Sequence, residues 1–234
     1  EIYTLSLHDA LPICVSTTLP AYVDVQRYLE MTNELRYNDN NAGGWYQTYS
    51  EEQVNNWIKR SKTDPDKYPN VDWRKLVLKD SAPRQTHSFN VAGGSKVVQT
   101  KVSLRYDKTD GLYANNSFER YMVRSNNDIK INKFLEAHAD INLKFSDYRT
   151  PNANPLYYNV RMIPPVYADH WSDGRYGDVK DGMNILAMLH EGGNTKSKYY
   201  RVGGKVALDF KPVEGLRLRS EEHTSELQSR VSIS

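Results

Sequence analysis

The chain has 234 residues, with 31 lysines and arginines against 29 acidic residues and a formal net charge of +2. This small, scattered excess does not favour a nucleic-acid-binding protein, and a single cysteine, Cys14, excludes a disulfide framework or a thiolate metal site. No run of about 18 apolar residues is present, which excludes an α-helical membrane protein but leaves open a transmembrane β-barrel, whose lipid-facing side chains alternate with polar ones.

The two ends of the chain differ from everything between them. Back-translation of residues 1–13 and 219–229 gives sequences that resemble the two opposed adapters of short-read sequencing libraries, both in frame. We therefore expect residues 1–14 and 219–234 to derive from adapters and to hang free of any sheet; the alternative is a native signal segment and a polar tail. Without their two basic and five acidic residues, 29 basic and 24 acidic residues remain, a net charge of +5, in what we expect to be a fragment of a longer protein.

Residues 15–85 predict short helices in a loop-rich region. Asp24 is suited to cap a helix over residues 24–35, and Ser50 with Gln53 has the spacing of a capping box at the start of a second helix. Such helices fit an extracellular loop of a barrel. They also fit a helical cap of a soluble protein.

Long β-strands are predicted in residues 86–218. In residues 134–148, apolar side chains alternate strictly with polar ones. The predicted strands cover residues 86–92, 97–107, 117–131, 134–148 and 198–210. Several exceed the length of about 5–6 residues that is usual for strands of soluble proteins.

The connections between these strands differ in length, and the short and long ones fall at opposite ends. This layout is typical of outer-membrane barrels, which have short periplasmic turns and long extracellular loops. We therefore predict an all-β fold, a fragment of a large transmembrane antiparallel β-barrel with long, partly helical extracellular loops. A soluble β-sandwich with one long functional loop is the alternative.

No residue pattern requires covalent chemistry, so we predict no catalytic residue and no metal site. The His–Glu pair at residues 190–191 lacks the second histidine of a zinc protease motif. His138 lies on the polar face of its strand, which predicts a lumen-lining role. Four aspartates of the long loop are predicted to form turns, with calcium binding as the alternative: Asp169, Asp173, Asp178 and Asp181.

Aromatic side chains gather at strand ends and in the long loop. Those at strand ends predict the interfacial girdle of a barrel. The loop aromatics are predicted to contact substrate or a partner protein, the alternative being that they pack the loop onto itself. They are Tyr157, Tyr158, Tyr167 and Trp171.

Several stretches, in this order, resemble the SusC/RagA family of TonB-linked outer-membrane transporters of Bacteroidota. They are YLEMTNEL at 28–35, YSEEQVNNW at 49–57, DPDKYPNVDW at 64–73, SAPRQTHSFNVAGGS at 81–95, VSLRYDKTDGLYANNSFERYMVRSNNDIKINKFL at 102–135 and PPVYADHWSDGRYG at 164–177. Together they cover most of residues 15–218, which makes the resemblance more specific than any single motif.

The resemblance implies a plugged barrel of about 22 strands in the outer membrane, with residues 15–85 as an extracellular loop region and residues 86–218 as barrel strands and loops. It further implies TonB-driven import of glycans or peptides together with a SusD-like surface lipoprotein, without enzymatic activity, cofactor or nucleic acid. The plug and the TonB-binding segment would lie outside this sequence. An extracellular carbohydrate-active or carbohydrate-binding β-sandwich protein and a passive porin are the alternatives.

Overall fold

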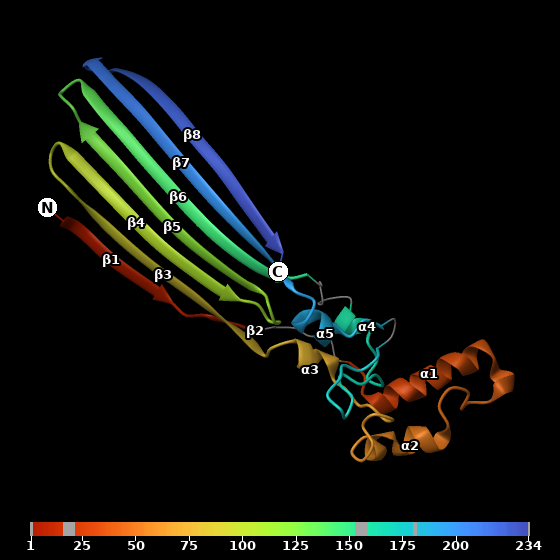
Figure 1. Ribbon diagram of the computed structural model, residues 1–234. Helices are drawn as coiled ribbons and strands as arrows, with labels where there is room; N and C mark the ends of the chain where they lie inside the picture. Colours follow the sequence, from red (N-terminus) through yellow and green to blue (C-terminus); the bar gives the residue numbers. More distant parts are fainter. Residues whose placement is uncertain (1, 16–21, 153–158, 180–181, 234) are drawn as a thin grey trace.

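The computed structural model describes residues 2–15, 22–152, 159–179 and 182–233, and consists of one antiparallel sheet with a group of short helices at one end (Figure 1). The strands follow the order β1-β3-β4-β5-β6-β7-β8, and β2 pairs with β3. Their bounds are β1 Ile2–Ala10, β2 Ile13–Val15, β3 Ser81–Gly94, β4 Val98–Asp110, β5 Ser117–Lys130, β6 Leu135–Pro151, β7 Asn194–Val213 and β8 Leu216–Ile233. The sheet is open, as expected for part of a barrel wall.

Strands β3 to β7 correspond to the five predicted strands, of which three extend one residue beyond an observed end, and each pairs with its neighbours in chain order. The observed strands are longer than most of the predicted ones, because backbone pairing between β6 and β7 continues to Pro151 and Asn194, beyond the alternating residues. The turns that join β3 to β4, β5 to β6 and β7 to β8 lie at one end of the sheet, and the long connections lie at the other (Figure 1). The predicted segregation of loop lengths is therefore confirmed.

The expectation that the two terminal segments hang free of the sheet is wrong. β1 pairs along β3, and β8 pairs along nearly the whole of β7. A strand at the edge of a sheet offers unpaired N–H and C=O groups to any extended chain, so this pairing does not require side chains that match the sheet.

The helices are α1 (Val25–Asp39), η1 (Asn41–Gly43), α2 (Glu51–Arg60), α3 (Trp73–Val77), α4 (Asn159–Met162) and α5 (Ile185–His190). Both predicted helix starts are confirmed. The Asp24 side chain accepts a hydrogen bond from the Arg27 N–H at 2.8 Å. Ser50 and Gln53 form the reciprocal capping box, at 3.2 and 2.9 Å. Among the described residues, no helix has the length and apolar character needed to cross a membrane.

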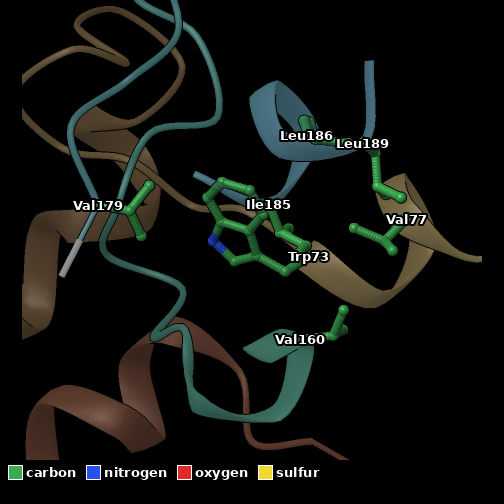
Figure 2. Close-up of a cluster of buried hydrophobic side chains, with 7 residues drawn as sticks. All are labelled: Trp73, Val77, Val160, Val179, Ile185, Leu186 and Leu189. Carbon is green, nitrogen blue, oxygen red and sulfur yellow. The ribbon is translucent and has the colours of Figure 1, made fainter. Parts of the chain in front are cut away.

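Two apolar clusters hold the helices together. In the first, side chains from α3, α4, α5 and residue 179 surround Trp73 (Figure 2), and its buried members are Trp73, Val77, Val160, Val179, Ile185, Leu186 and Leu189. The second joins α1 to α2 through Val25, Leu29, Val54, Trp57 and Tyr68. We call residues 22–80 together with residues 159–190 the cap. The cap therefore joins residues that precede β3 to residues of the connection between β6 and β7.

Candidate functional site

The sheet has one apolar and one polar face, set by its register. One row of directly paired residues on the apolar face crosses five strands, with side chains that remain 36–53% exposed: Phe89, Leu104, Val123, Leu143 and Val202. In the described part of the chain no second sheet covers this face. A contiguous exposed apolar face is foreign to a soluble β-sandwich, whose inner faces pack against each other, and it fits contact with lipid.

The apolar face ends at a sharp boundary toward the cap. Aromatic rings from four neighbouring strands lie in one row, with adjacent centroids 4.9–6.0 Å apart: Tyr106, Tyr121, Phe145 and Tyr200. The next row on the same face is charged and consists of the ion pairs Lys108–Glu119 at 3.5 Å and Asp147–Lys198 at 3.7 Å. An aromatic row followed by charged residues is typical of the interface between lipid and water.

Polar side chains within the apolar face bond to one another. Thr100 donates to the Asn127 side-chain oxygen at 2.9 Å, and the Asn127 amide donates to Ser125 at 3.0 Å and to the Ala139 carbonyl at 3.1 Å. This mutual pairing lowers the cost of placing these groups against lipid, where water cannot replace a missing partner.

The polar face contains a buried carboxylate near the cap. Asp107 is 2% exposed and accepts hydrogen bonds from Arg105 at 2.9 Å, from Arg120 at 2.7 Å and from the Thr86 hydroxyl at 2.9 Å. Two guanidinium groups and a hydroxyl offset the cost of burying its charge. The network ties β3, β4 and β5 together on the side away from lipid.

A second network lies near the opposite end of the polar face. His138 contacts Asp128 at 2.5 Å and Asp209 at 3.0 Å, which confirms its place among the charged side chains of this face. Glu136, His138 and Asp209 are close enough for a shared metal ion. Lys211 binds Glu136 at 2.6 Å and Arg217 binds Asp209, so cations already neutralise both carboxylates and the residues fit an ion-pair network better than a metal site.

The cap is bound together by hydrogen bonds between distant segments. The Val71 N–H donates to the Pro165 carbonyl at 3.0 Å, and the Ser172 hydroxyl donates to Asp66 at 2.8 Å. The Asn115 side chain, from the connection between β4 and β5, donates to the Leu189 carbonyl at 2.8 Å. The first two bonds join the two segments of the cap, and the third fixes the cap to the rim of the sheet.

Two of the aromatic residues predicted to contact substrate or partner, Tyr157 and Tyr158, lie outside the described residues. Tyr167 is half-buried and packs against the cluster around Trp73. Trp171 is half-buried in a turn, where its N–H donates to the Arg175 carbonyl at 2.8 Å. Tyr167 thus helps to pack the loop, while Trp171 contributes a backbone hydrogen bond to its turn.

The four loop aspartates do not form a cluster of metal ligands within the described residues, and Asp181 lies outside them. Asp173 pairs with Arg175 at 2.7 Å, and hydrogen bonds from that arginine lower the pKa of the aspartate. Asp169 contacts His170 at 3.2 Å. These contacts agree with the predicted turn-forming role.

A cleft of about 460 Å³ opens between α1, α3 and residues 162–165 of the cap. The Arg74 guanidinium lies over the Tyr22 ring at 5.4 Å within it. Deeper in the cap, burial and the neighbouring Tyr28 and Tyr167 raise the pKa of the Tyr49 hydroxyl. The described residues that line this cleft include no serine, threonine, cysteine, lysine or histidine.

No family model matches the chain. The TonB-dependent receptor P26 of Formosa agariphila is 31% identical over 161 residues, which are 67% of this chain and 16% of that receptor. The chain belongs to the SusC/RagA-like TonB-dependent receptors. Its fold agrees with the structure of the RagAB peptide importer in the closed-closed state, at a TM-score of 0.72 and 18% identity over 98% of this chain, and with that of the RagAB peptide transporter, at 0.71 and 19%.

The chain spans 28% of the matched RagAB chains and 16% of receptor P26. These relatives are a receptor and an importer. A SusC/RagA-like TonB-dependent receptor resides in the outer membrane, so the sheet is a part of an outer-membrane β-barrel.

Proposed function

We propose that the chain contributes wall strands and an extracellular cap to a TonB-dependent importer of glycans or peptides. The observation that carries this proposal is the two-faced sheet, with an uncovered apolar face, a charged opposite face and an aromatic row at the boundary toward the cap. From Tyr200 to Phe210 the apolar face of β7 spans eleven residues, and the ten rises between them give about 33 Å of strand. At a strand tilt of about 40° this corresponds to roughly 25 Å, the usual height of the lipid-facing band.

The orientation follows from the connections. The cap is on the side of the long loops, which are extracellular in barrels of this type, so residues 15–85 form an extracellular region and residues 86–218 form wall strands and loops. Half-buried Tyr167 and Trp171 help to shape the cap surface that faces a SusD-like lipoprotein or the substrate. The RagAB neighbours, described as a peptide importer, support a partner of this kind. TonB would act through a segment outside this sequence.

We also propose that residues 1–14 and 219–234 are adapter-derived. The register of β8 supports this origin, because Glu222 pairs with Val206 and Glu226 with Val202. Both carboxylates therefore fall on the apolar face, where lipid would meet them. The alternation of the sheet continues through Leu218 and ends at the first residue of the adapter match.

Gene deletion in the source bacterium tests the importer. Deletion should abolish growth on one class of oligosaccharide or peptide, the full-length receptor should restore it, and the receptor without its TonB-binding segment should not. Full growth of the deletion strain on all such nutrients would contradict the proposal.

Long-read sequencing of the source DNA across both ends of residues 15–218 tests the adapter origin of the terminal segments. Native DNA that encodes EIYTLSLHDALPI would refute that origin.

A further inference from the structure

The polar face of the sheet is divided into two parts of different charge. Three successive rows in the half nearer the cap, which start with Thr86, Ser88 and Asn90 on β3, carry five cations and one carboxylate between β3 and β7. These are Arg105, Arg120, Arg124, Lys144 and Arg201, with Asp107. The three rows below balance three lysines and His138 against four carboxylates: Lys101, Lys130 and Lys205 with Asp128, Glu136, Asp140 and Asp209. The half nearer the cap therefore has an excess of positive charge that the sheet does not neutralise.

Two of these cations face each other directly. Lys144 on β6 is the cross-strand partner of Arg201 on β7, and neither has an ion-pair partner among the residues that the structure describes. Like charges in directly opposed positions of a sheet destabilise it. An anion between Lys144 and Arg201 would convert this repulsion into two attractive contacts.

These two residues line a pocket of about 470 Å³. Its other walls on β6 and β7 are Ser146, Tyr148, Thr150, Ser197 and Tyr199; Leu227, in the adapter-derived part of β8, also borders the pocket and forms no part of the proposed site. The Tyr148 and Tyr199 rings meet edge to face with centroids 5.6 Å apart, and both remain more than a third exposed. The pocket thus combines positive charge, hydroxyl groups and aromatic surface.

Ser146 adds an independent indication of a ligand. Its side chain is 1% exposed, lines the same pocket, and its hydroxyl has no hydrogen-bond partner within the described residues. A buried hydroxyl without a partner costs free energy. A ligand oxygen in the pocket would supply the missing bond.

We propose that this pocket binds the anionic group of the transported substrate and that the substrate is an acidic oligosaccharide, an inference that rests on the proposed import function. The planar Arg201 guanidinium binds a carboxylate or sulfate through two parallel hydrogen bonds, and Lys144 contributes a second positive charge. Ser146, Thr150 and Ser197 pair with sugar hydroxyls, while the tyrosine rings pack against the sugar ring. An acidic peptide would match the charge, and its backbone amides would also pair with the hydroxyls, but it would present no sugar ring to the two tyrosine rings.

The test measures binding to the purified full-length receptor, extracted from the outer membrane. The probes are tetragalacturonate, a neutral tetrasaccharide and a tetraglutamate peptide. The wild-type receptor should prefer tetragalacturonate, and Lys144→Gln combined with Arg201→Gln should weaken that binding by about tenfold or more. The matched control, Lys101→Gln with Lys130→Gln, removes the same charge from the balanced half and should change binding less than twofold.

Equal binding of the acidic and neutral tetrasaccharides would overturn the inference, as would equal losses in the two double variants. Preference for the tetraglutamate peptide would overturn the assignment to a sugar. In each of these cases the import function still holds if the receptor resides in the outer membrane and supports growth. A receptor that supports no growth would refute the import function itself.

Discussion

Glu119 and Tyr121 lie two residues apart on the same face of β5, and the apolar surface ends between them. Tyr121 belongs to the aromatic row that faces lipid, whereas Glu119 pairs with Lys108 at 3.5 Å. The same change occurs on β6 between Phe145 and Asp147 and on β7 between Tyr200 and Lys198. Neighbouring strands change from aromatic to charged side chains at the same level. We therefore attribute this boundary to the surrounding medium and place the edge of the bilayer there.

A charge placed below this boundary should prevent assembly. We expect Ile141→Arg in the full-length receptor to cost about 2–4 kcal/mol, because position 141 faces lipid near the middle of the band. The measurement is the yield of heat-modifiable receptor in the outer membrane. Asn142→Arg, one residue away on the polar face, should assemble normally, and an equal loss for both variants would refute the assignment of the faces.

Asp107→Asn should destabilise the barrel wall. The substitution leaves Arg105 and Arg120 facing a neutral amide, and breaking a buried ion pair costs about 3–5 kcal/mol. Denaturant unfolding of the full-length receptor in detergent should show a lower midpoint. Asp110→Asn, at the end of the same strand, should leave the midpoint nearly unchanged. An unchanged midpoint for Asp107→Asn would mean that the network does not stabilise the wall.

Asn33 organises the start of the cap. It is fully buried on α1, accepts hydrogen bonds from the Thr48 and Tyr49 N–H groups at 3.0 and 2.9 Å, and donates to the Tyr49 carbonyl at 2.7 Å. Asn33→Ala leaves these backbone groups without partners, at about 1–3 kcal/mol for each buried group. Hydrogen exchange at residues 48 and 49 should accelerate. Asn38→Ala, on the exposed side of α1, should not change it.

Alkaline pH should loosen the cap. Burial raises the pKa of Tyr49 above its usual value of 10.0. The unfolded chain therefore releases this proton at a lower pH than the folded cap does, so the cap loses stability as pH rises through and above 10. Hydrogen exchange or proteolysis of the cap between pH 9 and 11 measures this loss. Tyr49→Phe should reduce it, and an identical pH profile in the variant would contradict the assignment.

The strands and helix starts were predictable because their signals are local. Alternation along a strand and a capping box depend only on neighbours in the sequence, and β3 to β7, α1 and α2 follow them. The partners of Asp107 and Asp209 were not predictable, because they depend on the register between strands. For the same reason the opposition of Lys144 and Arg201 was visible only in the sheet, although each residue lay on a predicted polar face.

The terminal segments illustrate the limit of composition as evidence. Both segments lie outside the stretches that resemble the family, yet the edges of β3 and β7 accept them, because backbone pairing does not require matched side chains. The side chains of β8 retain the signal, since Glu222 and Glu226 break the alternation that its neighbour β7 maintains.

The most direct test of the membrane wall places spin labels at Asn142→Cys and Leu143→Cys of the full-length receptor in lipid bilayers. The account predicts that the label at position 143 is accessible to oxygen dissolved in the lipid and shielded from a water-soluble nickel reagent, with the opposite result at position 142. Access of the water-soluble reagent to both positions would contradict it, because the apolar face of the sheet would then not face lipid.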